Sequence, residues 1–147
     1  MKHSEFLSHL DDEKIVSAIA AAERRSSGEI RVFISRKTPA TGQETLALAQ
    51  QTFASLGMTQ TRHRNGVLLF FAPGTQQFAI LGDSAVHEKC GDSFWQEVTA
   101  ALSTLLKQGH FTGALLAGIE KAGAVLAQHF PRGPDDRNEL PDGIERD

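Results

Sequence analysis

The run Val67–Ala72 constrains the fold more than any other part of this 147-residue chain. All of its residues are apolar, without the alternation of a strand that has one face in water. We therefore expect a strand buried on both faces at the centre of a sheet. Turn signals lie on both sides, Asn65-Gly66 before the run and Pro73-Gly74 after it. The segment 76–81 then predicts the returning strand of a hairpin.

The rest of the sequence alternates between helix and strand patterns. Residues 29–36 form a β-branched run that predicts a strand, and apolar residues at helical spacing predict four helices. These helices span about residues 12–25, 44–56, 92–107 and 111–129. The order is α-β-α-β-β-α-α, an α/β sandwich with a small central mixed sheet flanked by helices. Gly113, Gly118 and Gly123 form a small-residue face on the last helix, suited to close packing.

Composition divides the chain into an N-terminal segment 1–10, a domain 11–131 and a tail 132–147. From Pro131 onward proline, glycine and charge dominate without apolar periodicity, so we expect a disordered charged tail. The formal net charge of −3 lies there, because residues 131–147 hold six acids and three arginines. The neutral remainder argues against a nucleic-acid-binding surface.

Cysteine content and hydropathy indicate a soluble cytoplasmic domain. The single cysteine, Cys90, has no internal disulfide partner and suits a reducing compartment. No signal peptide is visible, and no run approaches the roughly 18 apolar residues of a spanning helix.

His87 and Cys90 have zinc-ligand spacing, but no second close pair accompanies them. Cys90 as a nucleophile is an equally weak hypothesis. Phosphate-binding and dinucleotide-binding glycine motifs are absent, so no organic cofactor is expected.

Strand polarity predicts that three polar side chains meet at one end of the sheet. The βαβ unit makes the first two strands parallel, and the hairpin makes the third antiparallel. The first strand begins at Glu29, the second at Asn65, and the third ends at Asp83. Their oxygens suit Ca²⁺ or Mg²⁺. Glu23 adds a carboxylate if the first helix packs nearby.

Three basic residues, Arg62, His63 and Arg64, precede the central strand at this same end. Arg62 and Arg64 suit an anion such as phosphate, which arginine binds through two hydrogen bonds. The alternative is structural. In that reading Glu29 pairs with one of the two arginines, and Asp83 caps the turn after its strand. The sequence leaves both readings open.

Five segments in the same order resemble the TPM domain family, over about residues 12–131. That family includes thylakoid proteins of photosystem II repair, a nematode acetylcholine-receptor modulator and many bacterial proteins. The segments are AAERRSSGEIRV (21–32), FASLGMTQT (53–61), RNGVLL (64–69), AILGD (79–83) and LAQHFP (126–131).

The resemblance implies an α/β sandwich, a divalent-cation site and the acid phosphatase activity associated with the thylakoid members. On the family motifs the cation ligands map to Glu29, Asn65 and Asp83, with Glu23 as a fourth. The chain lacks the targeting segment, the membrane anchor and the extra aspartates of the thylakoid type, and is most similar to bacterial members without an anchor. We expect a binding module that docks on membrane-associated protein complexes or helps assemble them. The alternative is a metal-dependent phosphatase.

Overall fold

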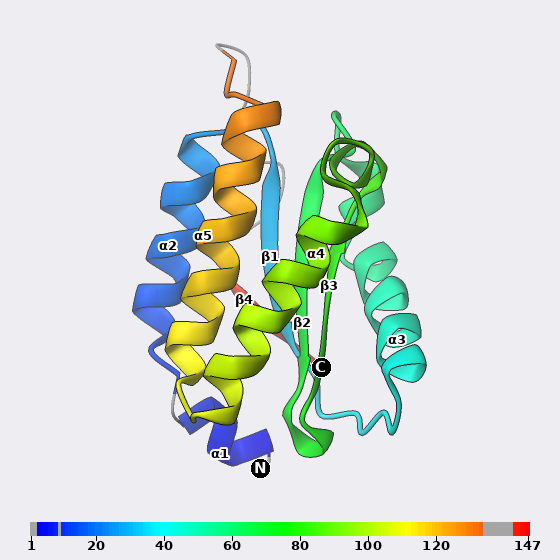
Figure 1. Ribbon diagram of the computed structural model, residues 1–147, viewed down its shortest axis with the longest axis vertical. Coiled ribbons are helices and arrows are strands. Elements are labelled where there is room, and N and C mark those ends of the chain that lie inside the picture. The colour runs from blue at the N-terminus through cyan, green and yellow to red at the C-terminus, as the bar shows by residue number, and fades with distance from the viewer. Residues whose placement is uncertain (1–2, 9, 134–142) are drawn as a thin grey trace.

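A computed structural model of the chain describes residues 3–8, 10–133 and 143–147, and shows a central sheet between layers of helices (Figure 1). The predicted fold class, a mixed sheet flanked by helices, is confirmed. In chain order the elements are α1 (His3–Ser8), α2 (Asp12–Arg24), β1 (Glu29–Ile34), α3 (Gly42–Ser55), the 3₁₀ turn η1 (Met58–Gln60), β2 (Gly66–Ala72), the 3₁₀ turn η2 (Pro73–Thr75), β3 (Gln77–Gly82), α4 (Ser84–Lys107), α5 (Phe111–His129) and β4 (Ile144–Arg146).

The sheet has the strand order β3-β2-β1-β4. Strands β1 and β2 are parallel, with Glu29 opposite Gly66. Strands β2 and β3 are antiparallel, with Val67 opposite Gly82. The predicted parallel pair and hairpin are both confirmed. Strand β2 is buried along its whole length, as the continuous apolar run predicts.

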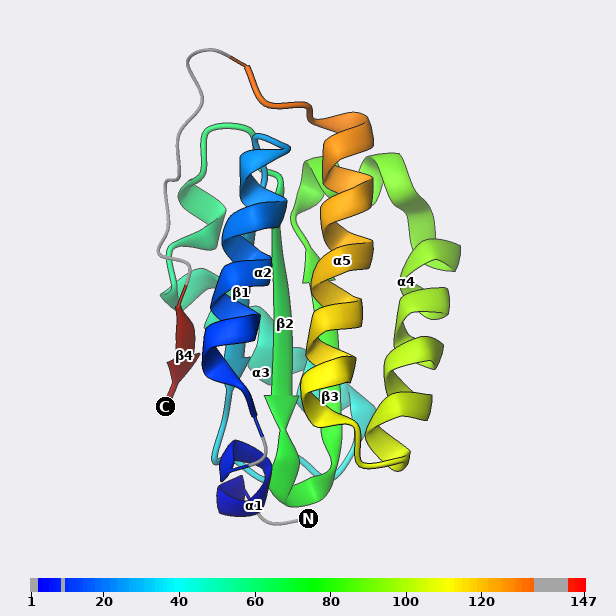
Figure 2. The ribbon, with the colours of Figure 1, turned by 90° about the vertical axis from the view of Figure 1, so that its left-hand side faces the viewer.

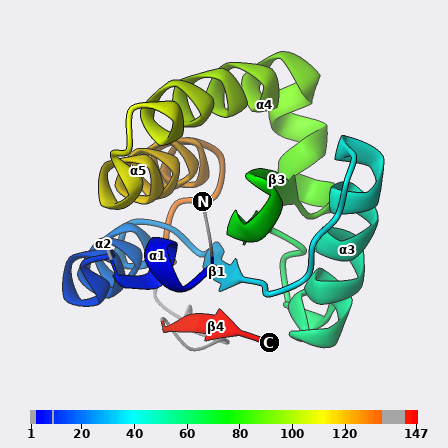
Figure 3. The same cartoon turned by 90° about the horizontal axis from the view of Figure 1, so that it is seen from below.

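Alternate residues of the central strands enter two separate cores. Ile30, Val32 and Ile34 of β1 face the larger core, which the apolar side chains of α2, α4 and α5 complete. Phe33 of β1 and Phe70 of β2 face the smaller core under α3, where their rings stack with centroids 5.8 Å apart. Figures 1 and 3 show these three helices on one face of the sheet and α3 on the other.

Helix α4 begins earlier than the sequence predicts. The apolar pattern indicates a helix from residue 92, whereas the structure starts it at Ser84. Gly91 interrupts the helical conformation with a φ of 73°, which explains why the periodicity does not run through it. A glycine tolerates this left-handed conformation at little cost.

The N-terminal segment contributes to the larger core through α1. Phe6 is almost fully buried. Its ring lies 5.9 Å from that of Phe71 and 5.1 Å from that of Phe111. Helix α1 therefore packs against the domain that the sequence places at 11–131.

The prediction of a disordered tail over residues 132–147 is wrong at its end. Ile144–Arg146 form β4, which pairs in parallel with β1 and places Ile144 opposite Val32 (Figure 2). Asp147 accepts a hydrogen bond of 2.7 Å from the backbone N–H of Arg36. Residues 134–142 lie outside the described residues, and there the prediction stays a prediction.

A buried ion pair joins β4 to the sheet. Arg31 Nη2 lies 2.6 Å from Glu145 Oε1, and the Arg31 side chain is only 3% exposed. A buried guanidinium without a carboxylate partner is costly. Arg31, a cation between the apolar residues Ile30 and Val32 of β1, thus supplies the physical reason why so polar a strand as β4 pairs here.

We expect Glu145→Gln to lower the free energy of unfolding by about 1–2 kcal/mol, because it leaves the Arg31 guanidinium without its carboxylate. Urea denaturation measures this loss. Arg146→Gln is the matched control on the same strand, since the Arg146–Asp12 pair is about half exposed on both sides and should contribute less than about 1 kcal/mol. Equal effects of the two substitutions would show that β4 is not docked through Arg31.

Close packing of α5 on α2 depends on Gly123. A Cβ there would lie 2.9 Å from the Cβ of Ala22, which has no torsion by which to move away. Gly123→Ala should therefore cost about 1–3 kcal/mol. Gly113→Ala on the same helix should leave stability unchanged or slightly raised, because its Cβ would meet nothing closer than 3.7 Å. Thermal unfolding of the two variants tests the contrast, and similar midpoints would contradict it.

Candidate functional site

Glu23, Glu29, Asn65 and Asp83, here called the acidic end, lie at the end of the sheet where β1 and β2 begin and β3 finishes. The strand registers confirm the predicted placement of Glu29, Asn65 and Asp83. This is the upper end of the molecule in Figure 1. All four side chains are buried, at 1% exposure for three of them and 6% for Asp83.

The carboxylate of Asp83 is held by Arg64 and by the first turn of α4. Arg64 Nε donates to Asp83 Oδ2 at 2.8 Å, and Arg64 Nη2 donates to Oδ1 at 2.9 Å. The backbone N–H of Ser84 donates to the same Oδ1 at 2.7 Å, so Asp83 also caps the helix. Of the two readings that the sequence leaves open, these contacts match the structural one for Asp83.

Arg64 is placed for this pairing by an uncommon backbone conformation. Its φ of 51° lies in the left-handed region, which residues other than glycine rarely adopt. The hydrogen bond to Asp83, and then the charge of Asp83, raise the pKa of Arg64. Arg64 uses Nε and Nη2 for Asp83. Both arginines of the predicted anion site, Arg62 and Arg64, are exposed.

Glu23 and Asn65 hold together the start of β1 and the start of β2. Glu23 Oε2 accepts a hydrogen bond of 2.7 Å from the backbone N–H of Ile30, the residue after Glu29. Helix α2 therefore brings its carboxylate to the strand, as the sequence hypothesis requires. Asn65 Nδ2 donates to Ser27 Oγ at 3.0 Å. Its Oδ1 is buried and accepts no hydrogen bond within the described residues.

Hard cations need several oxygen ligands, which the acidic end offers in part. Glu23, Glu29 and Asn65 carry suitable oxygens, and the orphaned Oδ1 of Asn65 is of the type that a cation binds. Asp83 contributes only if it releases Arg64. No group of three or more His, Cys, Asp or Glu side chains near enough to share one ion occurs in the described part of the chain. The role of these residues as metal ligands stays a prediction.

His87 and Cys90 lie on the first part of α4. His87 Nε2 lies 3.6 Å from Asp92 Oδ1, so its exposed ring has an acidic neighbour. Burial raises the pKa of the Cys90 thiol. Since the thiolate is the reactive form, this shift disfavours Cys90 as a nucleophile.

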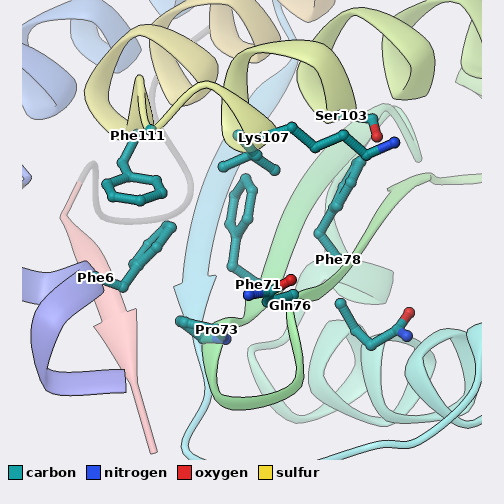
Figure 4. Close-up of a pocket in the computed structure, with 11 residues that line it drawn as sticks. Phe6, Phe71, Pro73, Gln76, Phe78, Ser103, Lys107 and Phe111 are labelled. Carbon is teal, nitrogen blue, oxygen red and sulfur yellow. The ribbon is translucent and has the colours of Figure 1, made fainter. Parts of the chain in front are cut away.

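A second candidate site, which the sequence did not predict, lies at the opposite, hairpin end of the sheet. Here a cavity of about 440 Å³, called the aromatic pocket, opens between the hairpin, α1 and the α4–α5 turn (Figure 4). Its apolar lining is Phe6, Phe71, Pro73, Phe78, Leu106 and Phe111. These residues come from segments far apart in the sequence, so no local motif marks the pocket. The only feature of the sequence that could have indicated an aromatic pocket is its nine phenylalanines.

The fold is that of a TPM domain. A model of the TPM domain family matches residues 1–125, and the chain belongs to this family. No curated protein matches the chain.

Three solved structures share the fold. The NMR structure of the BA42 protein from the psychrophilic bacterium Bizionia argentinensis is 37% identical and superposes with a TM-score of 0.84, covering 95% of this chain and 96% of that one. The N-terminal domain of a protein from P. gingivalis is 17% identical, with a TM-score of 0.57 and coverage of 83% and 80%. The N-terminal domain of the cg2496 protein from Corynebacterium glutamicum is 18% identical, with a TM-score of 0.53 and coverage of 86% and 74%. The last two likenesses concern the fold alone.

Crossing a bilayer requires a helix that is both long and apolar. None of the described helices combines the length and the apolar composition needed to cross a membrane.

Substitutions at Asp83 should separate its two structural roles. Asp83→Ala removes the helix cap and the carboxylate, and should cost about 1–2 kcal/mol for the cap alone. Asp83→Asn keeps a capping oxygen and loses only the charge that faces Arg64, so its cost should be smaller but measurable. Asp92→Asn is the control on the same helix, because Asp92 is 83% exposed. Urea denaturation without divalent cations measures all three. A rise in stability for Asp83→Asn would contradict the structural role and indicate repulsion between acids.

Proposed function

We propose that this chain is a binding module that docks on membrane-associated protein complexes or helps assemble them. The observation that supports this concerns the polar side chains of the acidic end. The groups that a hydrolase would need there already form contacts that hold the fold together. Asp83 holds Arg64 and caps α4, and Glu23 accepts a hydrogen bond from the strand backbone. Phosphomonoester hydrolysis needs an activated nucleophile or metal-bound water, with positive charge available to the phosphate. We place the module in the cytoplasm because its single cysteine suits a reducing compartment.

The proposal includes a divalent cation, Ca²⁺ or Mg²⁺, at the acidic end. Glu29, Asn65 and Glu23 would hold it through their side-chain oxygens, and the buried Oδ1 of Asn65 supports this assignment. Asp83 would join them only by giving up its contacts with Arg64. The bound cation would supply positive charge to buried carboxylates, whose desolvation is otherwise costly.

The alternative function is a metal-dependent acid phosphatase. It rests on the family resemblance and on one observation, the exposed position of Arg62 at the same end of the sheet. In this reading Arg62 holds the phosphate and the cation activates the attacking water. Arg64 would contribute only after release from Asp83.

Thermal unfolding in EDTA and in millimolar Ca²⁺, Mg²⁺ or Mn²⁺ tests the cation. At a hundredfold excess over the dissociation constant, binding adds about 2.7 kcal/mol of stability, which should raise the melting temperature by ~8 °C. Glu29→Gln should abolish this rise. Glu88→Gln, an exposed acid on α4, should retain it. An unchanged midpoint with all three cations would remove the cation from the proposal.

A phosphatase assay on the same preparations separates the two functions. The binding module predicts cation binding by calorimetry without turnover of p-nitrophenyl phosphate. Turnover that requires both the cation and Glu29, and that falls with Arg62→Gln, would replace the module by the phosphatase.

A further inference from the structure

The aromatic pocket has a continuous series of phenylalanine rings along its wall. Between successive ring centroids the distances are 5.1 Å from Phe111 to Phe6, 5.9 Å from Phe6 to Phe71, and 6.0 Å from Phe71 to Phe78. The four rings come from α5, α1, β2 and β3, and Figure 4 shows them around one cavity. The volume of about 440 Å³ is within the range of about 300–1,000 Å³ typical of pockets for small organic ligands.

The polar groups that line the pocket are few, and one of them is charged. Lys107, at the end of α4, is the only titratable residue of the lining within the described part of the chain. Ser103, one turn earlier, and Gln76 and Gln77, in the hairpin, are neutral. Figure 4 shows the Lys107 side chain extended along the α4 side of the pocket, above the rings of Phe71 and Phe78.

The ammonium group of Lys107 is available to a ligand. Lys107 is exposed, and it forms none of the ion pairs found among the described residues. A carboxylate placed at this rim would gain an ion pair without displacing another acid. An ammonium group at the same place would be repelled.

The lining thus fits a ligand with an apolar body and a single negative charge. The rings provide an apolar surface, and covering it by another apolar group is favourable. Phosphate dianions are best matched by the planar, two-pronged guanidinium of arginine, and the lining contains no arginine. One lysine with neutral hydrogen-bonding neighbours suits a monocarboxylate instead.

We propose that the aromatic pocket binds a small monocarboxylate with an extended apolar chain, of the medium-chain fatty acid class. The hydrocarbon lies against the phenylalanine rings, and the carboxylate lies at Lys107. The pocket and the acidic end are at opposite ends of the sheet, so this site is independent of the cation proposed above.

Titration of ¹⁵N-labelled protein with hexanoate, octanoate and decanoate, below the concentrations at which micelles form, tests the site. Backbone amide signals of Phe78, Leu106 and Phe111 should shift, whereas those of Asn65 and Asp83 should not. Each added methylene should tighten binding by about fourfold until the cavity is filled.

Substitution of Lys107 tests the head group. Lys107→Gln should weaken decanoate binding by about fivefold, as expected for an exposed ion pair, and should leave the weaker binding of decanol unchanged. Lys89→Gln, near the other end of α4, should change neither affinity. Both lysines are exposed, so the variants should unfold at the wild-type temperature, which thermal unfolding checks.

Two results would overturn the inference. Equal affinities for decanoate, decanol and decylamine would show that the pocket does not select a carboxylate. The absence of shifts at Phe78 and Phe111 in millimolar decanoate, or shifts centred on the acidic end, would show that the aromatic pocket is not the site.

Discussion

Burial of β2 on both faces is the constraint on which the rest of the structure depends. Val67, Leu69 and Phe71 enter the core shared with α2, α4 and α5, while Leu68 and Phe70 enter the core under α3. Both faces must be covered, so helices are needed on both sides. Both edges of the strand are hydrogen-bonded, so β1 and β3 are needed as neighbours. Loss of any one layer would expose one of the two cores to water.

The directions of the strands give the two ends of the sheet different chemistry. At one end β1 and β2 begin and β3 finishes, which brings Glu29, Asn65 and Asp83 together. There the pairing of Asp83 with Arg64 connects β2 to α4. At the other end, the hairpin after Phe71 forms a wall of the aromatic pocket. At the first end, hydrogen bonds of Asp83, Glu23 and Asn65 hold elements together. The second end presents apolar surface and the exposed ammonium group of Lys107. The two proposed binding sites therefore differ in ligand class and lie apart.

Strand polarity predicted where the acidic side chains would lie, but could not decide what they contact. Whether Asp83 binds a cation or pairs with a base depends on Arg64, whose left-handed φ of 51° no residue preference indicates. Glu23 reaches the N–H of Ile30 because α2 packs beside β1. Neither contact has a signature in the local sequence, since each depends on how two separate elements are docked.

The sequence by itself determined α2, α3, α5 and the part of α4 that follows Gly91, together with the first three strands and their relative directions. Apolar periodicity and turn residues are local signals, and short connections allow few topologies. Only the tertiary structure decided the place of Ile144–Arg146, which is too short and too polar to show a strand pattern and which pairs beside β1 with Glu145 against the buried Arg31. The tertiary structure also decided the aromatic pocket, because Phe6 of α1 and Phe111 of α5 meet only when these two helices pack on the same sheet. The physical reason is the same in both cases: contacts between distant segments arise from packing and charge burial, which leave no periodic trace along the chain.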